Sequence, residues 1–112
     1  VLVDALIYVE SRGKDDAIGD THLGKPSIGV LQIRPIMVRE VNRILRKSSI
    51  SKSFKLKDRF NRQKSIEMFK VWKNHHHPED GFEMISRNWN GGSHGYKKKR
   101  TEKYWVKVQK QL

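Results

Sequence analysis

A carboxylate stands in an otherwise apolar stretch at the start of the chain. The first eleven residues read VLVDALIYVES, and Glu10 follows Val3 and Ile7 at helical spacing. A helix that is apolar on all sides is a buried helix, so Glu10 is expected among core side chains at a helix end. Burial raises the pKa of a carboxyl group, which suits a general acid near neutral pH. The alternative is a structural Glu that pairs with Arg12 or Lys14.

Four short motifs follow one another along the chain. Glu10-Ser11 precedes a glycine-punctuated stretch that leads into SIGVLQI (residues 27–33) and Pro35, and NWNGG (residues 88–92) and TEKYWVKV (residues 101–108) come later. In order and approximate spacing they resemble the lytic transglycosylases of the soluble (SLT) type and the related goose-type lysozymes. That family has Glu-Ser, then Gly-Leu-Met-Gln-Ile/Val with Pro soon after, a Tyr-Asn-Ala-Gly loop and a late Thr-x-x-Tyr-Val. The resemblance covers essentially the whole chain.

The resemblance implies a lysozyme-like, mainly α-helical fold with a cleft for a glycan strand. It implies the MurNAc–GlcNAc backbone of peptidoglycan as the substrate, no cofactor, and Glu10 as the catalytic acid and then base. Glu10 would protonate the glycosidic oxygen and then deprotonate the C6 hydroxyl of MurNAc, which attacks its own anomeric carbon. The product would be a 1,6-anhydro sugar. One carboxyl group suffices for this reaction because the nucleophile is intramolecular.

Inverting hydrolysis is the alternative reaction, and it needs a second carboxylate to activate water, roughly 6.5–9.5 Å from the acid. Asp20 is the leading candidate, and Asp15 and Asp16 in the same loop are the runners-up. The alternative role for Asp20 is ordinary turn chemistry after Gly19. Many transglycosylases have Ser near this position, so the Asp leaves hydrolysis and transglycosylation both open.

The resemblance also implies substrate-binding roles for Ser27, Gln32, Trp89, Asn90 and Tyr104. Gln32 matches the family Gln that lines the cleft, and its alternative role is a satisfied loop amide. Trp89 stands where the family has Tyr, and because an indole offers only an N–H donor, it either stacks on a sugar ring or closes the core. Tyr104 matches the late family Tyr and would bring a phenol near the acid, unless it is simply an interior tyrosine.

Two further residues are expected to support the site. Ser11 is predicted to bond to the backbone near the helix end. Gly29 is predicted to allow a close approach of two backbone segments, with a plain turn as the alternative.

A run of histidines and a run of basic residues also stand out in the sequence. Consecutive His residues on a helix point in different directions, so we expect no functional metal site at His75–His77, despite Glu79 and Asp80 nearby. The run Lys97–Arg100 is either a solvated loop or a surface that attracts the anionic cell envelope, through stem-peptide carboxylates, teichoic acids or lipopolysaccharide phosphates. Attraction of that kind weakens with salt.

Hydrophobic periodicity predicts the elements that must position these residues: five helices and one long loop, in a compact, mainly α fold. The first helix covers residues 1–11, and the loop of residues 12–34 contains a short strand or hairpin. Pro35 opens the second helix. Residues 47–57 are a polar, basic connector, and residues 90–96 are a glycine-rich loop. The second helix turns three basic side chains away from the core: Arg39, Arg43 and Arg46.

Capping residues predict where the remaining helices begin. Asp58 or Asn61 caps the third helix, which runs to about His76, Pro78 opens a short fourth helix, and Thr101 caps the last one. The side chains that these three helices are expected to turn inward are Ile66, Phe69, Trp72, Phe82, Ile85, Trp89, Tyr104, Trp105, Val108 and Leu112.

Composition limits the class of protein. The 112 residues fit one domain, expected to span residues 1–112, and are enough to bury one core. The absence of Cys excludes a disulfide framework and thiolate metal ligands, and no apolar run approaches the ~20 residues of a membrane helix. Lys and Arg number 24 against 12 Asp and Glu, and the formal net charge of +12 predicts an anionic partner.

Two other functions fit parts of the sequence. A basic nucleic-acid-binding module would use Lys, Arg, Trp and Tyr for phosphate and stacking contacts, but no helix-turn-helix signature is present and Glu10 would have no role. A non-catalytic glycan-binding domain is compatible with Trp89 in place of Tyr. We favour the peptidoglycan-cleaving enzyme and do not expect nucleic acid as its partner.

The expected setting follows from the same hypothesis. Residues 1–9 lack the basic start and the small-residue cleavage site of a signal peptide, so any export signal is expected to lie outside this chain. Size and charge are typical of a domain excised from a phage virion enzyme or a secreted muralytic enzyme, with other domains of that enzyme as partners. The expected location is the cell envelope or periplasm, the medium, or a virion.

Overall fold

An apolar helix begins the fold. In the computed structural model, which describes residues 1–112 apart from the side chain of Leu23, helix α1 spans Leu2–Ser11. Leu6 is inaccessible to solvent, and its helical neighbours Ala5 and Ile7 are buried as well. The helix is not buried all round as predicted, because Asp4 and Tyr8 on its other side are exposed.

The described residues form five α-helices, three short 3-10 helices and a two-stranded hairpin. The remaining α-helices are α2 (Pro35–Lys47), α3 (Arg62–His76), α4 (Phe82–Gly91) and α5 (Lys99–Gln109). The hairpin pairs β1 (Ile18–Gly19) with β2 (Ser27–Ile28) in antiparallel register, with Ile18 opposite Ile28 and Gly19 opposite Ser27. The 3-10 helices are η1 (Thr21–Leu23), η2 (Leu56–Phe60) and η3 (Gly95–Lys97).

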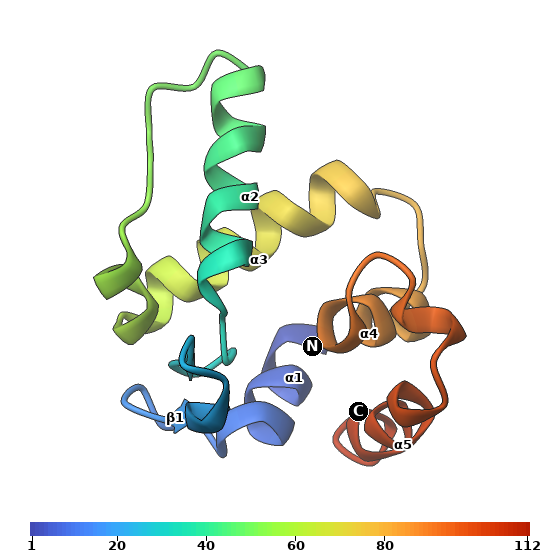
Figure 1. Ribbon diagram of the computed structural model, residues 1–112. Coiled ribbons are helices and arrows are strands. Elements are labelled where there is room, and N and C mark those ends of the chain that lie inside the picture. Colours follow the sequence, from blue (N-terminus) through green and yellow to red (C-terminus); the bar gives the residue numbers. More distant parts are fainter.

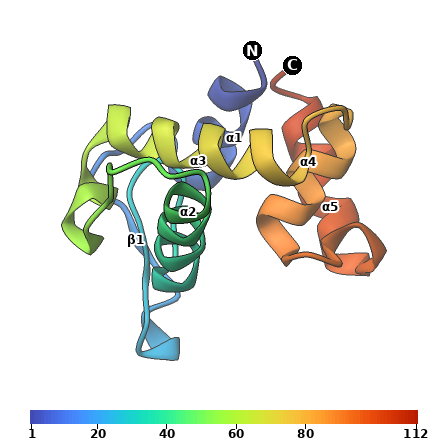
Figure 2. The same cartoon turned by 90° about the horizontal axis from the view of Figure 1, so that it is seen from above.

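The helices form two groups that share one core. Helix α2 packs on α3, while α4 packs on α5, and α5 also contacts α1. Figures 1 and 2 show α2 and the hairpin on one side of the molecule and α4 and α5 on the other, with α3 reaching across. The mainly α class and the short hairpin predicted from the sequence are confirmed.

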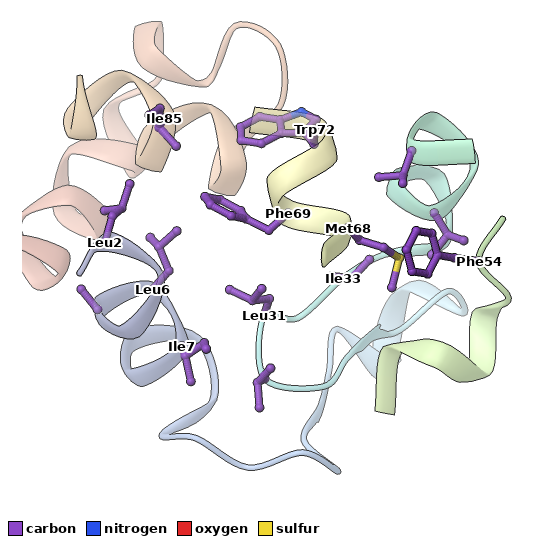
Figure 3. Close-up of a cluster of buried hydrophobic side chains, with 14 of the residues drawn as sticks. Leu2, Leu6, Ile7, Leu31, Ile33, Phe54, Met68, Phe69, Trp72 and Ile85 are labelled. Atoms are coloured by element: carbon purple, nitrogen blue, oxygen red, sulfur yellow. The ribbon is translucent and has the colours of Figure 1, made fainter. Parts of the chain in front are cut away.

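The core draws on the loop as well as on the helices. In Figure 3, Leu31 points into the space between Leu6 of α1 and Phe69 of α3. Val30 and Leu31 are inaccessible to solvent. The segment that follows the hairpin is therefore tied to the core, and it carries the next residue, Gln32, in a defined position.

Several predictions of local structure are confirmed. Pro35 is the first residue of α2. Asn61 caps α3, because its side-chain Oδ1 accepts a hydrogen bond of 2.9 Å from the backbone N–H of Lys64. The three arginines of α2 that were expected to face away from the core are exposed: Arg39, Arg43 and Arg46.

The start of the fourth helix was predicted wrongly. Pro78 does not open it, because the chain leaves helical geometry at His77 and stays irregular up to Gly81, whose extended backbone precedes α4. Phe82 then occupies the first helical position and is exposed rather than inward.

The last helix also differs from the prediction. It begins at Lys99, so Thr101 lies within its first turn and is not its N-cap. The Thr101 side chain is fully buried, and its hydroxyl, which has one proton to donate, lies within hydrogen-bond distance of the carbonyl oxygens of Gly95 and Lys98. Leu112 lies beyond the end of the helix at Gln109 and is exposed, not inward. Among the described residues, no helix is both long and apolar enough to cross a membrane.

Candidate functional site

A groove of about 1130 Å³ lies between the two groups of helices. Its lining comes from the end of α1, the hairpin, the start of α2, the end of α3, α4 with the loop after it, and the start of α5. Six of the residues predicted to form the site line it: Glu10, Asp20, Ser27, Gln32, Trp89 and Asn90.

Glu10 is the acid of the groove whose pKa is raised. Its side chain is half-buried at the C-terminal end of α1, and its Oε2 accepts a hydrogen bond of 3.0 Å from the Tyr104 hydroxyl. Burial raises the pKa of Glu10 to about 7; the Tyr104 hydrogen bond lowers it, and the charge of Asp20 raises it. This carboxyl group can therefore hold a proton near neutral pH and still release it.

The alternative role for Glu10, an ion pair with Arg12 or Lys14, is not formed. Arg12 turns to Tyr8 instead: its Nη1 donates to the Tyr8 hydroxyl at 2.6 Å, and its guanidinium lies 4.6 Å from the centre of that ring. No basic side chain among the described residues is paired with Glu10.

Tyr104 brings a buried phenol to the acid from the opposite end of the sequence. It lies on the inner face of α5, and its burial, followed by the charge and hydrogen bond of Glu10, raises the pKa of its hydroxyl far above the ordinary value. The hydroxyl therefore stays protonated and acts as a hydrogen-bond donor to Glu10.

Asp20 lies in the hairpin and faces the same groove. Its backbone has a φ of 55°, in the left-handed region, and its Oδ2 accepts a hydrogen bond of 2.6 Å from the Ser27 hydroxyl. Neither runner-up lines the groove. Asp15 is paired with Arg62 at 3.1 Å, and Asp16 is exposed. Of the three loop acids, only Asp20 is placed near Glu10.

Gln32 braces the hairpin from within the groove. Its Nε2 donates to the carbonyl oxygens of Ala17 at 3.2 Å and Gly29 at 3.1 Å. A Cβ at Gly19 would lie 2.4 Å from Gln32 Oε1, so Gly19 leaves room for this amide. Gln32 thus has the contacts of a satisfied loop amide while its side chain also lines the groove.

Gly29 and Ser11 hold the loop from behind. Gly29 has a φ of 86°, and a Cβ there would lie 1.9 Å from the carbonyl oxygen of Arg59, so only glycine permits this backbone approach. The buried Ser11 hydroxyl donates to the carbonyl oxygen of Val30 at 2.8 Å and accepts from the N–H of Gly13 at 3.2 Å. These contacts fasten the loop to α1 and to η2.

Arg59 is a supporting residue that the sequence analysis missed. It is buried, and its Nη1 donates to the carbonyl oxygens of Pro26 and Ile33, each at 3.0 Å. Burial lowers the pKa of this guanidinium. An Arg just after the basic connector carries no local pattern that distinguishes it, and only the folded chain brings it to residues 26–33.

Trp89 packs against core aromatic residues and also lines the groove, while its stacking on a sugar ring stays a prediction. Its ring centre lies 5.1 Å from that of Phe69 and 5.0 Å from that of Trp72, in edge-on arrangements. It is also half-buried and lines the groove together with Trp72 and Asn90. Indole and amide groups thus occupy the wall opposite the hairpin.

Asn88, which the sequence analysis treated only as part of a motif, shapes that wall. It is buried, its Oδ1 accepts from the backbone N–H of Tyr96 at 2.8 Å, and its Nδ2 lies 3.4 Å from His77 Nε2. His77 Nδ1 is in turn paired with Asp80 Oδ2 at 2.7 Å. The network ties the loop after α4 to the end of α3.

The histidine run takes part in ordinary pairs. His76 Nε2 lies 2.5 Å from Glu40 Oε2, and hydrogen bonds from Arg43, together with His76, lower the pKa of Glu40 to about 2. No group of three or more His, Cys, Asp or Glu side chains that could hold a metal ion occurs within the described part of the chain.

The basic run reaches the groove at its second and fourth residues. Lys98 and Arg100 line it, and the Lys98 ammonium donates to the carbonyl oxygen of Gly91 at 2.8 Å.

Comparison of the chain with protein-family models, with curated proteins and with solved structures found no match. Functional inference therefore depends on the side chains of the groove and on the motifs that place them.

Proposed function

We propose that this protein cleaves the β-1,4 bond between MurNAc and GlcNAc in peptidoglycan, as a lytic transglycosylase with a lysozyme-like fold. The observation that carries the proposal is Glu10: a carboxyl group with a pKa of about 7, held by the Tyr104 hydroxyl at 3.0 Å, in a groove of about 1130 Å³. Its position directly before Ser11, followed in order by the Gln32, Asn90 and Tyr104 motifs, supports the resemblance to that enzyme family.

The reaction uses one carboxyl group twice. Protonated Glu10 gives its proton to the glycosidic oxygen as the bond to the MurNAc anomeric carbon breaks, and GlcNAc leaves as an alcohol. The resulting carboxylate removes the proton of the C6 hydroxyl as that oxygen bonds to the anomeric carbon, which closes the 1,6-anhydro ring. Tyr104 donates to the carboxylate, stabilising the charged form between the two steps.

Inverting hydrolysis remains the second candidate because Asp20 lines the same groove and its charge raises the pKa of Glu10. In that reaction Asp20 would activate water while Glu10 protonates the leaving oxygen. Its hydrogen bond from Ser27 would orient the carboxylate. The product would be a reducing sugar rather than an anhydro sugar.

The deciding experiment is mass spectrometry of soluble fragments released from purified peptidoglycan by wild type and by Glu10→Gln. We expect anhydro-MurNAc ends from wild type and a loss of at least about 100-fold in rate for Glu10→Gln. Glu79→Gln, which changes an exposed acid outside the groove, serves as the matched control and should keep full activity. Reducing ends would identify a hydrolase and make Asp20→Asn the next variant. Unchanged activity of Glu10→Gln would refute the mechanism, and no fragments from any variant would favour a glycan-binding module.

Thermal unfolding provides the fold control for Glu10→Gln. The pKa of Glu10 is raised from 4.5 to about 7 in the folded protein, so the folded state holds this proton more tightly than the unfolded chain. The protonated Glu10 carboxyl group therefore contributes stability to the folded state below about pH 4.5, and this contribution is lost as the pH rises to about 7. Because Gln stays uncharged, the variant should unfold at a higher temperature than wild type at pH 8 and at a similar temperature at pH 4.

The proposed setting is the anionic cell envelope, approached through the basic surface of the protein. The formal net charge of +12 supports this partner, and a secreted enzyme or a virion enzyme with further domains would deliver the activity there.

A further inference from the structure

Two arginines of the groove have no partner in the part of the chain that the structure describes. Arg34 stands immediately before α2, and Arg100 lies in the first turn of α5; both are exposed and both line the groove. Neither guanidinium makes a hydrogen bond or an ion pair with another described residue. In Figures 1 and 2 the helices that follow or carry them, α2 and α5, lie in different parts of the molecule.

The acids of the groove are already engaged. Asp20 accepts a hydrogen bond from Ser27 at 2.6 Å, and Glu10 accepts one from Tyr104 at 3.0 Å. Glu40 is held by Arg43, whose Nε and Nη2 donate at 2.7 Å and 2.8 Å, and by His76. Asp20 keeps its negative charge, because a hydroxyl does not neutralise it, but the charged groups of the groove that have no hydrogen-bond partner at all, Arg34 and Arg100, are positive.

A guanidinium is suited to one kind of ligand. Its planar fork of N–H donors matches a carboxylate and binds it through two parallel hydrogen bonds. Lys98 adds a third positive charge to the groove, although one of its donors is used on Gly91. A neutral sugar polymer would leave these charges unanswered, whereas a glycan that carries carboxylates would pair with them.

We propose that Arg34 and Arg100 bind carboxylate groups attached to the glycan, so that the groove selects a carboxylate-bearing β-1,4 glycan over a neutral one of equal length. The inference rests on the proposed function in taking a β-1,4 glycan as the ligand. The lactyl group of MurNAc and the peptide stem attached to it share the carboxylate chemistry, and the two sources are separated by the choice of probe.

Binding is measured with the full chain carrying Glu10→Gln, so that no probe is cleaved. Three probes of equal sugar number are compared: a neutral GlcNAc oligomer, GlcNAc–MurNAc strands with free lactyl carboxylates, and the same strands with peptide stems. Of the two probes that carry carboxylates, we expect the one that binds more tightly to bind about tenfold more tightly than the neutral oligomer. This is the difference in affinity that two partly exposed charge pairs allow. Preference for the second probe assigns the lactyl carboxylate, and preference for the third assigns the stem.

A charge-matched pair of variants separates the groove from the general positive field. The double variant Arg34→Gln/Arg100→Gln should bind the three probes with dissociation constants within about twofold of one another. A difference that small shows that no charge pair with the probe remains. Arg39→Gln/Arg46→Gln removes the same charge from exposed positions of α2 outside the groove and should keep the preference. Equal binding of the three probes by the parent, binding of none, or an equal loss in both double variants would overturn the inference.

The outcome is independent of cleavage. Release of anhydro ends together with no preference among probes would refute the role of Arg34 and Arg100 and leave the proposed function intact. If the preference depends on both arginines but wild type releases no fragments, the carboxylate-binding role of the groove is supported and the proposed cleavage activity is refuted.

Discussion

At the scale of single residues, the chemistry depends on the pair formed by Glu10 and Tyr104. The two influences on Glu10 that come from neighbouring side chains oppose each other: the Tyr104 hydroxyl stabilises the charged form, whereas the charge of Asp20 destabilises it. Both act on a carboxyl group whose pKa is raised mainly by burial. The site is therefore adjusted by two groups that can be removed separately.

Replacing these neighbours should move the pKa of Glu10 in opposite directions. Tyr104→Phe removes a donor to the carboxylate and should raise the pKa above about 7, whereas Asp20→Asn removes a like charge and should lower it. Carbon-detected NMR titration of the Glu10 carboxyl group measures both changes without relying on activity. Where the variants are active, the alkaline limb of the pH–rate profile should move in the same directions, because the acid must be protonated. Shifts of the same sign in both variants would contradict this account.

At the scale of elements, the long loop after α1 is held by backbone contacts more than by regular structure. Its hairpin has only two residues in each strand, yet it carries Asp20 and leads to Gln32. A longer sheet would hold such a loop by many backbone hydrogen bonds between its strands. Here the loop is held instead by the close approach of Gly29 to Arg59 and by the Ser11–Val30 hydrogen bond of 2.8 Å. The position of two groove residues thus depends on a few contacts behind them.

Gly29→Ala should be far more destabilising than the same change at an open position. At Gly29 a Cβ meets the carbonyl oxygen of Arg59 at 1.9 Å, in addition to the cost of a φ of 86°, so we expect a loss of about 3 kcal/mol or more. Gly24→Ala has a comparable φ of 69° but no atom within 4 Å, and it should cost only about 1 kcal/mol. Urea unfolding measures both free energies. Equal losses would show that backbone strain alone, and not the close approach, matters at Gly29.

At the scale of the whole molecule, positive charge is spread over the surface, and on α5 it forms a stripe. Lys99, Lys103, Lys107 and Lys110 follow one another at helical spacing along α5 and its end, and all four are exposed. No ion pair involves any of them among the described residues. This stripe starts at Lys99, between the groove residues Lys98 and Arg100, so it would hold an anionic surface next to the groove.

Retention on purified cell envelope should therefore weaken with salt. We expect most of the protein to sediment with the envelope at low salt and to be released at about 0.5–1 M salt, where the Debye length falls to a few ångströms. A variant with the four α5 lysines changed to Gln should be released at lower salt than wild type. Co-sedimentation measures both effects, and retention that does not respond to salt would argue against an electrostatic partner.

Local patterns of the sequence determined the number and type of the main elements. The periodic apolar residues predicted five α-helices, and Pro35 and Asn61 marked two helix starts correctly, because a missing N–H and a side-chain acceptor act within one turn. Pro78 and Thr101 were misleading for the same reason. Each can begin a helix locally. In the fold, the chain around Pro78 is irregular and His77 is paired with Asp80, while α5 begins two residues before the buried Thr101.

The tertiary structure alone decided which side chains meet. Glu10 was singled out from its apolar surroundings and Asp20 was already preferred among the loop acids. The contact of Glu10 with Tyr104 from the far end of the chain, the pairing of Asp15 with Arg62, and the supporting roles of Arg59 and Asn88 required the folded chain. The hydrophobic periodicity of one segment indicates which of its side chains face the core and which face solvent. Distances between segments depend on how their buried faces pack against one another, and no local pattern of residues contains that information.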